Sequence, residues 1–515
     1  MLVLLLLISI TLALSLHINN DNRDYEQYKC IYCIDSLEHY KSNTTITTSS
    51  TKSNDDDALL YDICLSQYQY NDLSYVVCSL FNNITISYNM IKDKPRSSCQ
   101  SLELCPLDND NNIWSKYNND DALDIRITKA MGSRGYNKVR VSVISNTTID
   151  SDIFTYKSQF KYRWTQNYLS TGIIDVNDGI NDITIAGQTI QIKLPSKGEG
   201  VRGVILADPC ITSQWIKCDY KDTFNMFEHL TGILNEMFNH DDMHYLQILG
   251  DNFYDQSSEP SNAFFKALKT KTKQNFLLTV PGNHDFFVSG VPSTATVKDQ
   301  WGNGFMQFYG QDVFASLSQT VPYDFSINPD IAYNTSASPN NFFEYNQLGN
   351  VLFIGYSGIH SFQDNSAYFT EACTFANDNE DTIDLIFLLG HWNFNNDGAT
   401  DGAVETVYVT LKSIPQCATV YEKIKFFEGH NHENVIITPE IGFKVGANGK
   451  AASNYVGEWG LAIVDTTDNK FQINYFPIAK VDTYDNYNDI ISCIQSSNGI
   501  SNCYDLAINW VNQTL

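Results

Sequence analysis

The segment that decides the fold is Tyr245-Leu-Gln-Ile-Leu-Gly-Asp251-Asn-Phe-Tyr254. It begins with a short, mainly apolar run. Gly250 follows, and after it come the carboxylate of Asp251, the amide of Asn252 and the phenol of Tyr254. Short apolar strands that end in glycine-containing loops are typical of α/β proteins, whose ligands bind at the carboxyl ends of the strands. The upstream apolar residues that share one face of an expected helix are Phe224, Phe227, Leu230, Ile233, Leu234, Met237 and Phe238.

Four further segments repeat this pattern of an apolar run followed by a polar residue. They are 203–207 before Asp208, 276–282 before Asn283, 385–390 before His391 and 424–429 before His430. Because the carboxyl ends of strands are where an open α/β sheet binds its ligands, we expect all these polar residues to face one site at one sheet edge. The glycines that precede most of them leave room for the backbone to turn sharply.

The polar residues at these strand ends are of the types that bind metal ions. Aspartate, asparagine and histidine side chains suit ions such as zinc, iron and manganese. Two acids and several imidazoles are more than one ion needs, so we expect two ions that share a carboxylate. Two ions roughly 3.5–4 Å apart can clamp a phosphoryl group and lower the pKa of a bound water.

These blocks, in this order, resemble the calcineurin-like metallophosphoesterases. The matching positions are Asp208, Gly250 to Tyr254, Gly282 to Asp285, Gly390 to His391 and Gly429 to His432. The resemblance covers about residues 200–480 and implies an α/β/β/α sandwich. The block that ends at Tyr254 is most similar to the purple (tartrate-resistant) acid phosphatases, in which this tyrosine binds a ferric ion.

Carried over residue by residue, the resemblance implies a centre of two metal ions. The ligands of metal 1 would be Asp208, Asp251, Tyr254 and His432, and those of metal 2 would be Asp251, Asn283, His391 and His430. His284 would stay off the metals and donate a hydrogen bond to the phosphoryl or leaving-group oxygen, which suits an imidazole that faces the same cavity. The implied metals are two divalent ions, or Fe(III) with a divalent ion (iron, zinc or manganese), or two zincs. The implied reaction is in-line attack of a metal-bound hydroxide on phosphorus.

The segment Asp208-Pro209-Cys210 departs from the family pattern. Many members have a histidine where Cys210 stands, and purple acid phosphatases have a glycine. Cys210 is either a thiolate ligand of metal 1 or the disulfide partner of Cys218. The disulfide is favoured, because secreted chains rarely leave a cysteine unpaired. Tyr254 then supplies the fourth ligand.

A second group of motifs lies near the N-terminus, where six cysteines fall between residues 30 and 105. Their spacing, with helical periodicity between them, suits a nested framework, although other connectivities are formally open. The segment 26–109 resembles the saposin B family, which implies a small all-α lipid-binding domain and the pairs Cys30–Cys105, Cys33–Cys99 and Cys64–Cys78. A redox or zinc motif at Cys30-x-x-Cys33 is the alternative. A saposin-like domain before an esterase domain is similar to acid sphingomyelinase, and so is a disulfide between Cys373 and Cys417.

The first residues and the cysteines indicate the secretory pathway. Residues 1–16 form an apolar run with a small-x-small site, which predicts a signal peptide, and a membrane anchor is the alternative. The run is shorter than a membrane span, and we expect no transmembrane segment in the mature chain. The even number of cysteines, 12, includes a further expected pair, Cys493–Cys503. N-glycosylation sequons occur at Asn43, Asn83, Asn146, Asn334 and Asn512.

The remaining regions are expected to be a linker over 106–120, a small all-β domain over 121–196 and a helical C-terminal tail over 481–515. The net charge of −26 argues against nucleic acid as a partner, because binding to phosphates needs a basic face.

The sequence therefore predicts a secreted, extracellular or lysosomal dimetal phosphoesterase of the acid-phosphatase kind that acts on a phosphate ester. One alternative is a sphingomyelinase-like phosphodiesterase that reaches membrane phospholipid through the saposin-like domain. A second alternative is a lipid-binding, saposin-type protein whose esterase domain is inert.

Overall fold

The structure is a computed structural model that divides into two compact units, Met1–Ser115 with Gln214–Ile216, and Lys116–Ser213 with Lys217–Leu515. In the first unit it describes residues 33, 36, 37, 60–67, 78, 79, 81, 84, 95–102 and 104. In the second it describes residues 123–161, 168–211, 226–240, 243–255, 259–285, 309–317, 339–394, 399, 401–448, 458–480, 483–497 and 499–515.

In the described part of the second unit, the larger sheet has eleven strands, and its centre is parallel. Along the sheet the strands are β18 (Tyr484–Asp485), β17 (Lys470–Lys480), β16 (Glu458–Asp465), β7 (Arg202–Leu206), β8 (Tyr245–Leu249), β9 (Phe276–Val280), β1 (Asp124–Lys129), β2 (Lys138–Ser145), β4 (Tyr168–Asp175) and β3 (Thr155–Lys161), and β19 (Ile508–Thr514) pairs with β17. The strands β7, β8 and β9 are buried along their whole length, as expected of parallel strands covered on both faces.

The smaller sheet has six strands among the residues that the structure describes. Its order is β10 (Glu344–Leu348), β11 (Val351–Gly355), β12 (Leu385–Leu389), β13 (Ile424–Glu428), β15 (Gly442–Val445) and β14 (Asn434–Thr438). From β11 through β15 the neighbours are parallel, whereas both outer strands run antiparallel.

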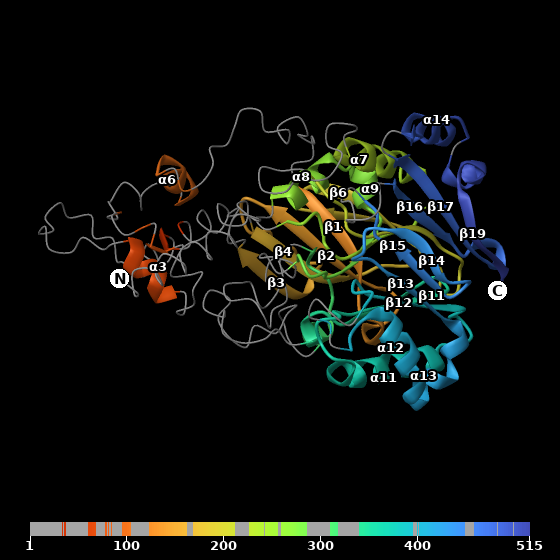
Figure 1. Cartoon of the computed structure of the whole chain (residues 1–515). Coiled ribbons are helices and arrows are strands. Elements are labelled where there is room, and N and C mark those ends of the chain that lie inside the picture. Colours follow the sequence, from red (N-terminus) through yellow and green to blue (C-terminus); the bar gives the residue numbers. More distant parts are fainter. Residues whose placement is uncertain are drawn as a thin grey trace, which may run out of the picture. The chain divides into compact units, whose positions relative to one another are not determined.

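The two sheets and the helices form four layers (Figure 1). Phe387 of β12 packs into an apolar core between the sheets, with Val280 and Ile127 of the larger sheet. Its neighbour Leu388 points the other way, into a core that includes Phe369. This outer face is covered by α11 (Phe362–Asp378), α12 (Val404–Thr410) and α13 (Pro415–Thr419). On the opposite side lie α7 (Met226–Met237), α8 (Glu259–Ala267), α9 (Thr270–Lys273) and α14 (Tyr487–Ser497).

The strands β1 to β4 do not form the separate β-domain expected over 121–196. They continue the larger sheet, because β1 pairs in parallel with β9 through Ile127 and Phe276. The inward side chains of β1, β2 and β4 enter the core between the sheets rather than a core of their own. Within 121–196, β5 (Gly179–Ile185) and β6 (Gln188–Leu194) form a two-stranded sheet apart from the larger one.

The C-terminal segment is only partly the helical tail that the sequence predicts. The helix α14 is followed by a 3₁₀ turn, Ile500–Leu506, and then by β19, which extends the larger sheet. Trp510 of β19 stacks on Tyr475 of β17 with ring centroids 4.8 Å apart, so aromatic packing favours a strand here.

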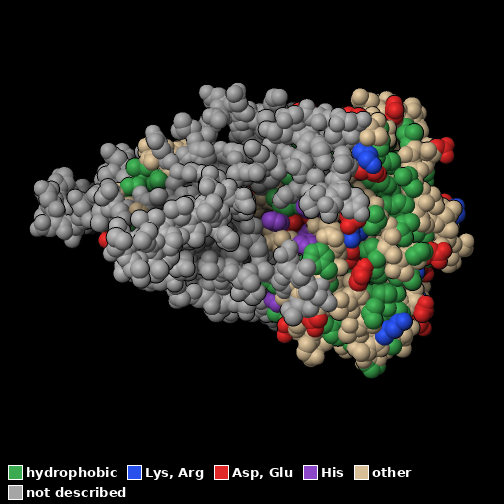
Figure 2. Space-filling model, in the orientation of Figure 1, with side chains coloured by type: hydrophobic (Ala, Val, Ile, Leu, Met, Phe, Trp, Pro, Cys, Tyr) green, Lys and Arg blue, Asp and Glu red, His purple; other side chains and the backbone are tan. Residues whose placement is uncertain are grey.

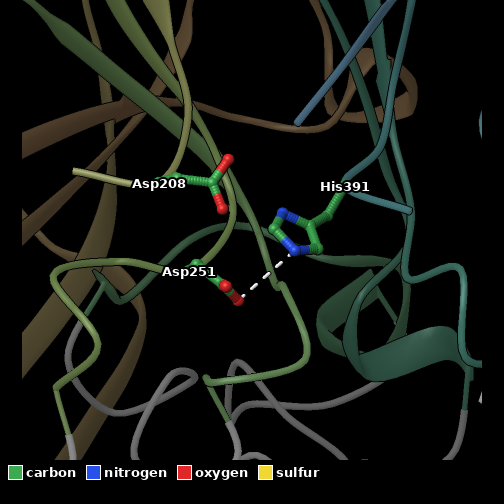
Figure 3. A group of neighbouring side chains, drawn as sticks. All are labelled: Asp208, Asp251 and His391. Carbon is green, nitrogen blue, oxygen red and sulfur yellow. Dashed lines mark ion pairs between the residues drawn. The ribbon is translucent and has the colours of Figure 1, made fainter. Parts of the chain in front are cut away.

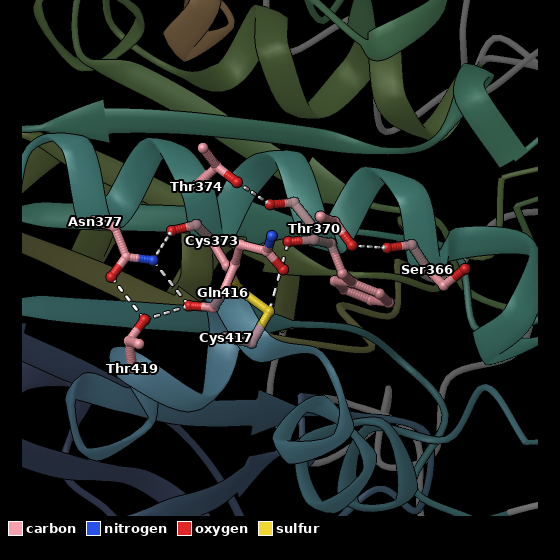
Figure 4. The surroundings of a disulfide bond; sticks show 9 residues. Ser366, Thr370, Cys373, Thr374, Asn377, Gln416, Cys417 and Thr419 are labelled. Carbon is pink, nitrogen blue, oxygen red and sulfur yellow. Dashed lines mark hydrogen bonds between the residues drawn. A yellow bond between two sulfur atoms is a disulfide. The ribbon is translucent and has the colours of Figure 1, made fainter.

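The disulfides present among the described residues are Cys33–Cys99, Cys64–Cys78, Cys373–Cys417 and Cys493–Cys503, and each is a pair expected from the sequence. Cys373–Cys417 joins α11 to α13, where the Asn377 amide donates to the carbonyls of Cys373 and Gln416 at 2.8 Å each (Figure 4). Cys210 is also disulfide-bonded, which removes it as a thiolate ligand. Cys30, Cys105 and Cys218 lie outside the described residues.

The first unit contains the helices α3 (Leu60–Gln67) and α6 (Pro95–Ser101). Leu60, Phe81 and both disulfides are buried there. The expected signal peptide, the linker 106–120, and the sequons at Asn43, Asn83 and Asn334 lie outside the described residues, whereas Asn146 and Asn512 are exposed. The part of the chain that the structure describes contains no helix with the length and apolar character of a membrane span.

Candidate metal centre

The residues expected to bind metal lie where strands of both sheets end. Asp208, Asp251 and Asn283 follow β7, β8 and β9 of the larger sheet. His391 follows β12 of the smaller sheet, and His430 and His432 follow β13. The site is therefore formed between two sheets, and not at the edge of one sheet as the strand pattern suggested.

The three most buried of the expected ligands lie close together and point toward one another (Figure 3). Asp208, Asp251 and His391 each offer a ligand atom, and these atoms lie within 4.8 Å of one another. At most 1% of the surface of any of the three is exposed, so a charged group here needs a counter-charge.

Backbone hydrogen bonds join the loops that carry these side chains. The Asp208 N–H donates to the Gly250 carbonyl at 3.1 Å, and the Gly429 N–H donates to the His391 carbonyl at 3.1 Å. The His430 N–H donates to Asp208 Oδ2 at 2.9 Å and so connects the two sheets. The ligands thus belong to one hydrogen-bonded framework.

The backbone of these loops is strained. Asp208, Asp251, Tyr254, His430 and His432 have positive φ angles, between 49° and 74°, although none is a glycine. Such conformations cost on the order of 1–3 kcal/mol each, and they occur at sites where the surrounding structure enforces them for a function.

Gly250 has a geometric requirement of its own. Its φ is 85°, and a Cβ atom there would lie 2.7 Å from both Gly282 N and His391 Nδ1. A larger residue would therefore push apart the loops after β8, β9 and β12.

The region around His391 has the donor arrangement of a cation site. His391 Nδ1 lies 2.8 Å from the Leu249 carbonyl, which can only accept, so this nitrogen carries the proton. Burial lowers the pKa of His391, which keeps the ring neutral and leaves a lone pair on Nε2.

That lone pair faces two oxygen atoms that have no proton to donate. They are Asn283 Oδ1 at 3.0 Å and Asp251 Oδ1 at 3.4 Å. His430 Nδ1 lies 3.2 Å from both His391 Nε2 and Asn283 Oδ1. With His430 protonated on Nε2, all four residues would offer lone pairs to one cation, so they fit a metal ion.

Two further side chains, Tyr254 and His432, meet beside Asp208. Tyr254 Oη lies 3.2 Å from Asp208 Oδ1 and 2.7 Å from His432 Nε2, and His432 Nε2 lies 3.5 Å from Asp208 Oδ1. Burial, followed by the Asp208 and Asp251 carboxylates, raises the pKa of Tyr254 well above its usual range. The phenol is thus neutral in the metal-free chain, and a cation would favour its phenolate form. This set also fits a metal ion.

His284 has a different position from the ligands. Its side chain is 25% exposed, and its Nε2 lies 3.9 Å from Asp251 Oδ2. The ring lies against Tyr254, with centroids 4.9 Å apart, and its backbone N–H donates to Asp251 Oδ1 at 2.9 Å. The imidazole is therefore fixed beside the centre and remains partly accessible. Histidine side chains are visible at the surface in the middle of the face shown in Figure 2.

Two residues of the quoted motifs have contacts that the sequence did not reveal. Asn252 and Asp285 are buried and hydrogen-bonded to each other immediately beside the expected ligands. Both stand within the blocks Gly250 to Tyr254 and Gly282 to Asp285, so their positions in those blocks were the available signal.

No protein-family model matches the chain, and no curated protein matches it. Among solved structures, it is similar to a purple acid phosphatase from seeds of yellow lupin (Lupinus luteus), at 12% identity and a TM-score of 0.45, over 71% of this chain and 74% of that one. It is also similar to PhoD, at 9% identity and a TM-score of 0.40, over 69% and 86% of the two chains. A third similar structure is a predicted phosphoesterase from Streptococcus pneumoniae, at 11% identity and a TM-score of 0.22, over 54% and 90%. These scores are below 0.5, so the function must be inferred from the side chains of the centre.

Proposed function

We propose that this chain is a metal-dependent phosphoric ester hydrolase whose active site is the centre at the strand ends. The observation that carries the proposal is the convergence of ligand atoms of Asp208, Asp251 and His391 within 4.8 Å of one another in a buried site, with Asn283 Oδ1 3.0 Å from His391 Nε2. A metal ion bound there would neutralise the buried carboxylates and accept the lone pairs of His391 and Asn283.

Two ions can be held if Asp251 is shared. Metal 1 would be bound by Asp208, Asp251, Tyr254 and His432, and metal 2 by Asp251, Asn283, His391 and His430. Two ions held in this way supply positive charge for a phosphoryl group and activate water. Imidazole, carboxylate and phenol ligands suit iron, zinc or manganese in either site.

His284 would act on the substrate directly. Its accessible imidazole lies next to the shared Asp251 and can donate a hydrogen bond to a phosphoryl or leaving-group oxygen. A positioned acid of this kind stabilises the charge that develops as the ester bond breaks.

We favour phosphate monoesters as substrates and a secreted or lysosomal location, as for an acid phosphatase. Tyr254 supports the monoester, because the resemblance to purple acid phosphatases depends on a tyrosine ligand at this position, and its Oη lies within hydrogen-bond distance of two expected ligands of metal 1. The disulfides Cys33–Cys99 and Cys64–Cys78 support the secretory pathway and favour a second candidate, a phosphodiesterase that acts on membrane phospholipid.

The proposal is tested by metal analysis and a visible spectrum of the purified full chain, together with assays on p-nitrophenyl phosphate and bis-p-nitrophenyl phosphate. We expect two metal ions per chain, and hydrolysis that a chelator removes and added metal restores. Iron with a visible absorption band selects the phosphatase, and two zincs without colour select the phosphodiesterase. A chain that holds no metal and hydrolyses neither ester overturns the proposal and favours the inert, lipid-binding alternative.

A further inference from the structure

The carboxylate of Asp285 accepts three hydrogen bonds and joins two loops of the centre. Its Oδ1 accepts from the Asn252 backbone N–H at 2.8 Å. Its Oδ2 accepts from the Asn252 side-chain amide at 2.9 Å and from the Gly282 N–H at 2.6 Å. Only 5% of the residue is exposed. Asn252 belongs to the loop after β8 and Gly282 to the loop after β9, so one buried carboxylate holds both.

Asn252 is in turn held on its other side. Its Oδ1 accepts a hydrogen bond from Thr279 Oγ1 at 2.8 Å, and its amide also donates to the Val280 carbonyl at 3.2 Å. Thr279 lies on β9, which is buried along its length. These contacts fix the orientation of the Asn252 amide, because its oxygen must face Thr279. In that orientation its N–H₂ group can donate to Asp285.

The residues next to these contacts are the proposed ligands. Asp251 precedes Asn252 in the chain, and Asn283 lies between Gly282 and Asp285. We infer that Asp285, together with Asn252 and Thr279, is a positioning residue that locks the loops after β8 and β9 so that Asp251 and Asn283 face the same metal ion. Both Asp285 oxygens are occupied by N–H donors, so it is not itself a ligand. This inference rests on the proposed metal centre.

The test is a calorimetric Zn²⁺ titration of the metal-free full chain and its variants. The two oxygens of Asp285 accept N–H groups from two loops, and Asp285→Asn keeps only one of these acceptors. The new N–H₂ group then faces the N–H donor of Asn252 or of Gly282, and that hydrogen bond is lost. We expect the Zn²⁺ affinity to fall by roughly 10- to 100-fold, the usual effect of losing a partner that orients metal ligands.

Two neutral changes separate positioning from loss of charge. Asn252→Ala and Thr279→Val alter the same hydrogen-bonded chain without changing its charge, and we expect both to weaken Zn²⁺ binding. Thr279→Ser keeps the hydroxyl and should retain the wild-type affinity. If Asp285→Asn alone weakens binding, the effect is electrostatic and the positioning role is overturned.

A stability control uses a buried carboxylate remote from the centre. Asp465 binds Arg202 Nε at 2.7 Å at the start of β7, whereas the centre follows the end of that strand. Asp465→Asn should lower the melting temperature and leave the Zn²⁺ affinity unchanged. If it weakens binding as much as Asp285→Asn, general destabilisation explains both, and the inference fails.

The wild-type titration distinguishes the two proposals. A wild-type chain that binds no Zn²⁺ overturns the metal centre itself. A wild-type chain that binds two ions, with the same affinity in Asp285→Asn, overturns only the positioning role.

Discussion

Asp251 is the carboxylate on which the proposed sharing of two metal ions depends. It lies 3.4 Å from His391 Nε2, accepts the His284 N–H at 2.9 Å, and is the ligand proposed for both ions. We predict that Asp251→Ala abolishes ester hydrolysis and lowers metal content at both positions, as measured by elemental analysis. Asn283→Ala is the comparison, because it should affect metal 2 more than metal 1. An Asp251→Ala chain with two ions and near-normal turnover would show that the ligand assignment is wrong.

His284 should behave differently, because it lies beside the proposed ligands and is proposed to act on the substrate rather than on a metal ion. We predict that His284→Ala retains both metal ions and loses about 10²- to 10⁴-fold in kcat, the usual contribution of a positioned acid or base. Metal content and turnover are measured on the same preparation. Loss of a metal ion from this variant would make His284 a ligand and leave the centre without its proposed acid.

The residues that meet at the centre were predictable because each belongs to a local pattern in which a polar side chain follows an apolar strand, in most cases after a glycine. The positions of Asn252 and Asp285 within the same blocks were visible, but their function was not. It depends on hydrogen bonds between two loops, and a pattern within one segment carries no information about such contacts.

Local sequence patterns predicted the central strands of the fold but not how these strands pair into sheets. Apolar runs identified β7, β8, β9, β12 and β13, since strands buried on both faces are continuously apolar. Their division between two sheets was not predictable from those runs, because pairing depends on distant segments. For the same reason β1 to β4 were expected to be a domain of their own, although β1 pairs with β9.

A buried histidine at the start of the paired strands β7 and β8 leads to a prediction about how stability depends on pH. His244 precedes β8, and its Nδ1 accepts the Arg202 N–H at 3.1 Å. Burial lowers the pKa of His244 to about 4, from an unfolded value of 6.5. The folded state therefore binds fewer protons than the unfolded state between these values, and the stability present above pH 6.5 is lost as the pH falls toward 4.

We predict that His244→Asn flattens this dependence, because its side-chain oxygen can replace Nδ1 as an acceptor and does not titrate. The free energy of unfolding is measured by urea denaturation from pH 7 to 4. It should fall less steeply in the variant than in the wild type, by up to about 1.4 kcal/mol per pH unit. Equal slopes in the two proteins would mean that His244 is protonated without cost in the folded chain.

For the whole molecule, the expected lipid-binding segment and the proposed hydrolytic centre lie in different compact units. All proposed ligands and His284 lie in the second unit. Asp208 lies in its segment Lys116–Ser213, and the others lie in its segment Lys217–Leu515. The two N-terminal disulfides lie in the unit that includes Met1–Ser115. Chemistry and access to lipid should therefore be separable by truncation.

We predict that a chain beginning at Lys116 still hydrolyses p-nitrophenyl phosphate, because its centre is complete. If the natural substrate is a membrane phospholipid, the shortened chain should lose most of its activity on vesicles, and detergent should restore part of it. The full chain assayed on the same vesicles is the control. Unchanged vesicle hydrolysis would remove the N-terminal unit as a lipid-presenting domain and favour a soluble monoester. A folded but inactive shortened chain would instead mean that the first 115 residues contribute to the centre.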